Sequence, residues 1–315
     1  MYYSRRTFVQ KATLASTSLP LLPLQSMSTL FEEHDDTLDV SIFSKHLQFL
    51  DVKEAGQVAA ELGFNGIDLT VRPKGHVLPE DVTSNLAPAI RDIERSGSSC
   101  KMITTAIDNA NKTEDVDIIK TAGDLGVNFY RMNWFKYHEG MSMVASLNLY
   151  QETIQNLVKL NKEHGITGCY QNHAGTKVGG SFWEIEKILD GIDSDYLGVQ
   201  YDIRHAVAEG GFSWENGLQL LHQKIKTIVL KDFKWAKVNG VWEAVNVPIG
   251  RGMVDFTKYF QLLKAYNLNP PVSMHMEYPL GGAEKGKFSI SVDKKKVFDA
   301  MKNDLSSIRE LWAKA

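Results

Sequence analysis

The sequence predicts a (β/α)8 TIM barrel, an α/β fold of one domain in which eight parallel strands alternate with helices. Three observations support this fold class. Short apolar runs alternate with helical patterns between residues 39 and 315, eight such runs are present, and no Pro-, Gly- or Ser-rich linker separates them. Alternating strands and helices lead to parallel pairing. Eight strand–helix units in roughly 280 residues are typical of this barrel, which is expected to occupy residues 31–315.

The predicted strands are short apolar runs, each followed by polar or turn residues. They lie at residues 39–43, 66–70, 100–105, 127–132, 166–171, 196–202, 225–231 and 271–277. The segments between them carry the signals of helix ends. Asp51 and Glu54 have the spacing of a capping box, Gly63 marks the end of that helix, and Ser181 with Glu184 repeats the capping-box spacing.

A doubly wound open sheet is the alternative architecture. Such a sheet usually has a glycine-rich phosphate-binding loop after its first strand, and the segment IFSKHLQF at 42–49 contains no glycine. The Gly-Arg-Gly of residues 250–252 follows no clear strand, so it is not a dinucleotide-binding fingerprint. The barrel is therefore the preferred prediction.

Composition and charge exclude several classes of protein. The chain has 315 residues, of which 43% are hydrophobic and 23% charged, values of an ordinary globular protein rather than of a disordered one. Lys and Arg number 35 against 38 Asp and Glu, a net charge of −3. This mildly acidic balance, with no basic stripe, argues against a nucleic-acid partner. The two cysteines, Cys100 and Cys169, do not form a disulfide framework.

The first 30 residues have the pattern of a cleaved export signal. Arg5 and Arg6 precede an uncharged apolar stretch, and SRRTF resembles the twin-arginine type. The stretch is short and interrupted by Pro20 and Pro23, so no stable membrane span is expected. Residues 1–30 are therefore predicted to direct the chain to the periplasm; the alternative is an amphipathic N-terminal helix on a cytosolic protein.

Nearly every predicted strand end carries an ionisable or amide side chain. In a (β/α)8 barrel the chemistry lies at the carboxyl ends of the strands, and such groups need mutual pairing or a polar ligand when they are buried. One shared binding site for a small molecule is expected there. The expected substrate-binding residues are Lys45, His46, Arg72, His76, Arg131, Trp134, Asn172, His173 and Arg251, the last of which lies between two glycines and could hold an anion.

Four strand-end residues have the same inward parity: Gln171, Asp202, Lys231 and Glu277. The amide, the two carboxylates and nearby histidines form an oxygen and nitrogen set suited to Mn²⁺, Mg²⁺, Co²⁺ or Zn²⁺. A structural interpretation remains open for each residue. Asp202 could cap a turn, Glu277 and Lys231 could pair across the barrel, and the histidines could be core residues. Trp134 could stack on a sugar ring or pack in the core.

At these residues the chain resembles the xylose isomerase-like TIM-barrel superfamily of sugar isomerases and epimerases. The motifs that carry the resemblance are YQNHAG (170–175), QYDIRHA (200–206), IVLKDF (228–233), PIGRGMVDF (248–256) and HMEYPLGGAE (275–284). The resemblance implies a divalent metal held by Glu, Asp, His and Glu from the fifth to the eighth strand. Asp202 and Glu277 match this set. Gln171 stands in place of the first Glu and Val229 in place of the His, so His173, His205 or water would have to fill the gap. His205, which also matches a substrate-contacting histidine, is the ligand expected.

The resemblance implies a carbohydrate isomerase or epimerase that works through a metal-stabilised enediolate. Two opposed glutamates serve as bases in that superfamily, and Gln171 leaves Glu277 as the one evident carboxylate base. Lys231 and His205 are then the expected catalytic partners. Two alternatives stay open: a lyase that cleaves an oxidised keto-glycoside by β-elimination, and a non-catalytic carbohydrate-binding barrel with a degenerate metal site. The predicted export favours a free sugar over a sugar phosphate. Oligomeric state is not predicted.

Overall fold

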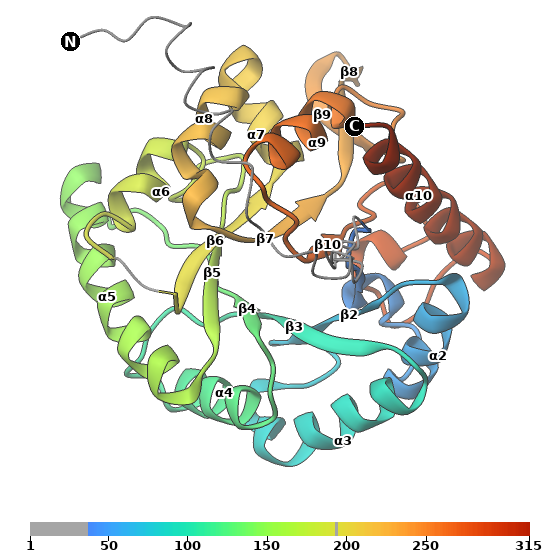
Figure 1. Cartoon of the computed structure of the whole chain (residues 1–315), viewed down its shortest axis with the longest axis horizontal. Helices are drawn as coiled ribbons and strands as arrows, with labels where there is room; N and C mark the ends of the chain where they lie inside the picture. Colours follow the sequence, from blue (N-terminus) through green and yellow to red (C-terminus); the bar gives the residue numbers. More distant parts are fainter. Residues whose placement is uncertain (1–36, 193–194) are drawn as a thin grey trace, which may run out of the picture. The chain divides into compact units, whose positions relative to one another are not determined.

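A closed barrel of eight parallel strands forms the centre of the computed structural model, which describes residues 37–192 and 195–315. The strands follow the order β1-β10-β7-β6-β5-β4-β3-β2 around the ring, and Figure 1 shows helices surrounding them. Their bounds are β1 Val40–Phe43, β2 Gly66–Val71, β3 Ser99–Thr105, β4 Phe129–Arg131, β5 Thr167–Gln171, β6 Leu197–Asp202, β7 Ile225–Leu230 and β10 Val272–Met274. The predicted fold class is confirmed.

The helices follow the strands along the chain. The α-helices are α2 Val52–Leu62, α3 Val82–Arg95, α4 Thr113–Asp124, α5 Met143–His164, α6 Phe182–Ile188, α7 Ile203–Gly210, α8 Trp214–Leu221, α9 Phe256–Ala265 and α10 Lys294–Lys314. The short 3-10 helices are η1 Ser44–Leu47, η2 Pro79–Asp81, η3 Gly211–Ser213, η4 His222–Lys224 and η5 Ala283–Lys285. No helix within the described ranges is long and apolar enough to cross a membrane.

One of the two predicted capping boxes forms. The Asp51 side chain accepts a hydrogen bond from the backbone of Glu54, whose side chain bonds back to Asp51, and Gly63 ends α2 with a φ of 90°. Only glycine adopts this left-handed conformation without steric cost. The second prediction is wrong, because Ser181 makes no side-chain cap at α6 and the Glu184 carboxylate instead accepts from Gly179.

A hairpin that the sequence analysis did not predict follows β7. Its antiparallel strands are β8 Asp232–Val238 and β9 Val241–Val247. Asn239 and Gly240 join them with φ values of 51° and 85°, the conformation that favours a tight two-residue hairpin turn. The predicted export signal at 1–30 lies outside the described residues.

Candidate active site at the carboxyl ends of the strands

A small cavity of about 70 Å³ lies where most of the strands end. Its lining residues are Phe43, Lys45, Arg72, Arg131, Trp134, Gln171, His173, Lys231, His275 and Glu277. Eight of these were predicted as site residues from the sequence. They follow or end β1, β2, β4, β5, β7 and β10, so the barrel topology brings together side chains that are far apart in the chain.

The ammonium group of Lys231 lies at the centre of the charged residues. Its Nζ lies 3.1 Å from Asp202 Oδ2, 3.3 Å from Glu277 Oε2 and 2.9 Å from His205 Nε2. The side chains of Lys231 and Asp202 are 4% and 0% exposed, whereas that of Glu277 is 25% exposed. Glu277 is therefore the carboxylate of this group that an incoming molecule can reach.

Two lysines bind the Glu277 carboxylate, one at each oxygen. Lys45 Nζ lies 3.0 Å from Oε1, and Lys231 is on the side of Oε2. Burial alone would raise the pKa of Glu277, but the charges of Lys231 and Lys45 outweigh it and hold the pKa well below its ordinary value. Glu277 is therefore ionised throughout the neutral range.

Asp202 ends β6 and begins α7 with no intervening loop. Its Oδ1 accepts from the backbone N–H of His205 at 3.1 Å and caps the helix, as the structural interpretation of Asp202 anticipated. Its Oδ2 accepts from Gln171 Nε2 at 2.8 Å. Burial raises the pKa of Asp202, and the attraction of Lys231 opposes that rise. Asp202 is thus committed to holding Lys231, Gln171 and α7 in place.

Two histidines lie against each other beside Lys231. The rings of His173 and His205 have centroids 3.9 Å apart. Burial, with the Lys231 charge, lowers the pKa of His173 to about 4 and that of His205 well below its usual value, so both rings are neutral at pH 7. His173 Nδ1 lies 2.8 Å from the carbonyl of Ala174. A carbonyl only accepts, so Nδ1 carries the proton and Nε2 of His173 keeps a lone pair.

The predicted metal ligands do not fit a divalent cation in this arrangement. The Lys231 ammonium lies between Asp202 and Glu277, where it would repel such an ion. Because an ionised carboxylate only accepts, the N–H₂ group of Gln171, and not its amide oxygen, faces Asp202. Val229 is fully buried and has no donor atom. Within residues 37–192 and 195–315, no group of three or more His, Cys, Asp or Glu is placed to hold a metal.

Four predicted substrate-binding residues do not line this cavity. His46 is buried, with Nδ1 3.2 Å from the carbonyl of Ala283 and Nε2 3.0 Å from the amide of Met276. His76 contacts Ser44 and Thr70, Asn172 bonds the backbone of Asp202 on both sides, and Arg251 is exposed in a loop. His46 and Asn172 are structural, because short polar contacts already satisfy them, whereas Nε2 of His76 has no hydrogen-bond partner among the described residues.

Trp134 is engaged by neighbouring side chains. Arg131 Cζ lies 4.3 Å and Lys177 Nζ 4.5 Å from the centre of its ring, and the His173 ring meets it edge-on at 4.5 Å. The indole N–H donates to the carbonyl of Gln171 at 3.1 Å. Of the two sequence interpretations, these contacts support packing, which fixes the position of Arg131 at the mouth.

Two residues near the site, Phe43 and Asp68, were not singled out from the sequence, and a third, His275, was expected only as one of the histidines near the strand ends. Phe43 and His275 line the cavity and stack with ring centres 4.4 Å apart. Asp68 lies in β2, fully buried, and accepts hydrogen bonds from Thr104 at 2.9 Å and Ser273 at 2.5 Å. A charged residue within the apolar run 66–70 was the available signal for Asp68, because a buried carboxylate in a barrel interior requires partners.

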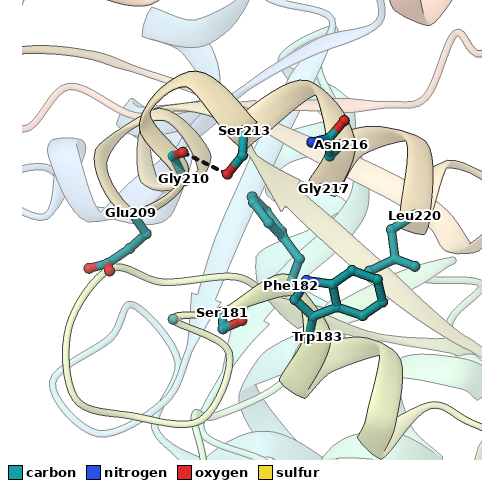
Figure 2. A pocket seen from close by; sticks show the side chains of 10 residues that line it. Ser181, Phe182, Trp183, Glu209, Gly210, Ser213, Asn216, Gly217 and Leu220 are labelled. Carbon is teal, nitrogen blue, oxygen red and sulfur yellow. Dashed lines mark hydrogen bonds between the residues drawn. The ribbon is translucent and has the colours of Figure 1, made fainter.

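A separate hollow of about 240 Å³ lies between α6 and the α7–α8 region, away from these charges. Figure 2 shows the aromatic rings of Phe182 and Trp183 on one side of it, with Ser213 bonded to Gly210 on the other. Its one carboxylate, Glu209, accepts from the backbone of Gly175. No predicted site residue lines this hollow, so the barrel mouth is the better candidate for chemistry.

The profile of a known protein family matches residues 57–292, which is most of the chain and most of the barrel. The chain belongs to the xylose isomerase-like TIM barrel family. This agrees with the closed eight-stranded ring and with the placement of charged residues at the strand ends.

Individual relatives are more distant. The chain is 32% identical over 131 residues to an inosose dehydratase of Bacillus thuringiensis (strain Al Hakam), a match that covers 37% of this chain and 42% of that protein. A D-psicose 3-epimerase of Clostridium cellulolyticum H10 superposes with a TM-score of 0.66 at 14% identity, covering 87% of this chain and 99% of that chain. A xylose isomerase-like barrel from Mycobacterium smegmatis, solved in complex with magnesium, gives a TM-score of 0.64 at 12% identity, covering 88% and 98%. The two superpositions establish a shared fold.

Proposed function

We propose that the protein moves a proton at the carbon next to the carbonyl group of a carbohydrate, as a sugar isomerase or epimerase does through an enediolate. The observation that carries the proposal is the setting of Glu277. It is the one carboxylate that lines the cavity, and an ammonium group lies beside each of its oxygens. A carboxylate base next to fixed positive charge suits a reaction in which negative charge develops on oxygen.

Glu277 removes the proton in this proposal. Its ionised state at neutral pH makes the base available without a prior titration. Lys231 and Lys45 then donate hydrogen bonds to the oxygens of the enediolate, in place of part of their present contact with Glu277. Preorganised charges of this kind act strongly because they need no reorganisation during the reaction.

His173 is the proposed second proton carrier. Its neutral ring lines the cavity, and its Nε2 is free of the carbonyl contact made by Nδ1. His205, in contrast, reaches the cavity through Lys231. We therefore assign His205 to positioning Lys231. The positive charge that Mn²⁺, Mg²⁺, Co²⁺ or Zn²⁺ was expected to supply is assigned to the Lys231 ammonium, and no step of this proposal uses a metal ion.

Elimination is the second candidate function. Two observations favour it: one carboxylate, rather than two opposed ones, lines the cavity, and the partial relative from Bacillus thuringiensis is an inosose dehydratase. After the same proton removal, the enolate would expel an oxygen substituent from the next carbon. The product would then be an unsaturated ketone together with water or an alcohol.

Incubation with a panel of keto-sugars in D₂O, followed by NMR, tests both candidates. Isomerisation or epimerisation places deuterium at the carbon next to the carbonyl of a rearranged sugar. Elimination instead gives an unsaturated product and a released water or alcohol. Glu277→Gln should abolish either signal. A folded protein that catalyses no exchange with any keto-sugar would contradict the proposal and favour the non-catalytic alternative.

We also propose that the chain is exported to the periplasm. The paired Arg5 and Arg6, followed by an uncharged apolar stretch without acidic residues, support this location. Expression of the full chain and of an Arg5→Lys/Arg6→Lys variant, followed by cell fractionation, provides the test. The proposal expects the unaltered chain in the periplasmic fraction and the variant in the cytoplasm, and equal distribution of the two would contradict it.

A further inference from the structure

A second cavity, of about 360 Å³, adjoins the first and has an unusual charge. It shares Lys45, Arg72, Arg131 and Trp134 with the cavity at Glu277. Five cationic residues line it, and all its other lining residues are uncharged. The five are Lys45, Arg72, Lys74, Arg131 and Lys285. Lys45 is already paired with Glu277, so an anion in this cavity would meet unpaired positive charge chiefly at the two arginines.

Arg131 is buried without a carboxylate in contact. It is 4% exposed, its Nη2 donates to the carbonyl of Thr105 at 3.0 Å, and its Nε has no hydrogen-bond partner among the described residues. Burial lowers the pKa of Arg131 to about 9, so the guanidinium is still charged at neutral pH. A buried charge without a counter-charge is costly, which indicates that an anionic group of a ligand completes its interactions.

Arg72 is half-buried and directly follows β2, which β3 separates from β4 in the barrel. Its Cζ lies 5.3 Å from the centre of the Phe43 ring. Within residues 37–192 and 195–315, neither Arg72 nor Arg131 forms an ion pair with a carboxylate. Asp68 is the buried acid whose charge most strongly raises the pKa of Arg72 and of Arg131. Its carboxylate already accepts hydrogen bonds from the hydroxyl groups of Thr104 and Ser273.

We propose that the substrate carries an anionic oxyacid group, a carboxylate or a phosphate, which Arg72 and Arg131 bind in this second cavity. Planar guanidinium groups match the oxygens of both groups in a two-point contact. The substrate's carbonyl end then reaches Glu277 and Lys231 through the shared wall, a step that rests on the proposed function. This proposal replaces the free sugar expected from the sequence with a sugar acid or a sugar phosphate.

Direct binding measurements test whether the protein recognises an anionic group, and they do not depend on catalytic turnover. Isothermal titration compares glucuronate and glucose 6-phosphate with glucose, the neutral match, on the full-length protein. We expect at least one anion to bind about tenfold or more tightly than glucose, with affinity that falls as salt increases. The anion that binds more tightly identifies the carboxylate or the phosphate as the group recognised. Equal affinity for glucose and both anions would overturn the proposal.

Variants locate the binding. Arg72→Gln and Arg131→Gln should each remove most of the preference for the anion, while Arg91→Gln, an exposed arginine on α3, should not change it. Thermal unfolding checks that each variant folds, and the half-buried Arg72 provides the informative variant if Arg131→Gln does not fold. Unchanged anion binding by a folded Arg72→Gln would contradict the assignment. Anion binding without any turnover would instead count against the proposed function alone.

Discussion

The two sides of the barrel mouth differ in whether their charged side chains are paired. On the side of β6, β7 and β10, the Lys231 ammonium lies 3.1 Å from the carboxylate of Asp202 and 3.3 Å from that of Glu277. On the side of β2 and β4, Arg72 and Arg131 line a cavity that has no acidic residue. The charged groups of the first side are paired with one another without a ligand, whereas the arginines of the second side have no counter-charge in contact among the described residues. This contrast teaches that reactivity and ligand recognition can be assigned to separate sides of one site.

The largest effect on activity is expected from a change of Glu277, the proposed base on the side of β6, β7 and β10. Glu277→Gln removes the proposed proton acceptor while the shape of the side chain stays the same, so kcat should fall about 10³-fold. Binding of the anionic substrate, which depends on the other side, should change little. Steady-state kinetics and titration measure the two effects. Glu243→Gln, an exposed glutamate on β9, is the control, and unaltered kcat in Glu277→Gln would remove Glu277 from the mechanism.

Removing the Lys231 charge from between Asp202 and Glu277 should also lower the stability of the fold. Lys231→Met leaves Asp202 buried beside Glu277 without its counter-charge, and the free energy of unfolding should fall by about 3 kcal/mol. Adding Asp202→Asn should restore much of this loss. Urea unfolding at pH 7 measures both variants. Lys226→Met serves as control on the same strand, because its pair with the exposed Asp195 lies at the surface and should contribute less than about 1 kcal/mol. Equal losses in Lys231→Met and Lys226→Met would contradict the pairing argument.

A buried carboxyl group that has no cationic partner should contribute to stability with a pH dependence opposite to that of Glu277. Asp304 in α10 accepts from Tyr278 Oη at 2.9 Å and from the amide of Ile249 at 3.3 Å. Burial raises the pKa of Asp304 to about 6, so the folded state binds the proton more tightly than the unfolded state. The contribution of Asp304 to stability therefore decreases as pH rises from about 4 to about 6, by roughly 2 kcal/mol.

Glu277 provides the comparison. The pKa of Glu277 is lower in the folded state than its ordinary value near 4.5, which applies to the unfolded chain. The contribution of Glu277 to stability is therefore fully present above pH 4.5 and is lost as the pH falls from there toward the folded-state pKa. Unfolding of Asp304→Asn measured from pH 4 to pH 8 should show a gain over the unaltered protein that grows with pH. Asp299→Asn, an exposed residue on the same helix, should show no such trend. A gain that is constant across this range would contradict the raised pKa.

The smallest effect concerns divalent cations. The unaltered protein should show no increase in melting temperature with Mn²⁺, because Lys231 already supplies the positive charge between Asp202 and Glu277. Lys231→Ala vacates that position and should gain a stabilisation of about 1 kcal/mol at Mn²⁺ concentrations several times Kd. Lys231→Ala/Asp202→Asn should lose the gain. A clear shift in the unaltered protein would mean that the ammonium does not exclude the metal.

Much of the fold could be predicted because its signals are local. The apolar runs mark each strand of the barrel, and strand parity places Lys231 and Glu277 at a common mouth. The hairpin β8–β9 was missed although Asn239-Gly240 between alternating residues is a strong turn signal. The role of Gln171 could not be predicted, since the direction of its amide depends on Asp202, a partner 31 residues away that must itself be held by Lys231. The capping-box spacing at Ser181 failed because Glu184 found another donor.

The ammonium of Lys231 has three N–H groups, and three neighbours already surround it: Asp202, Glu277 and His205. Each oxygen of an arriving molecule must therefore exchange places with one of these neighbours. Such an exchange trades one bond for another and adds little to affinity. Improving the enzyme for a new molecule would consequently begin at the arginines, whereas changes around Lys231 would alter turnover and leave residence time nearly the same.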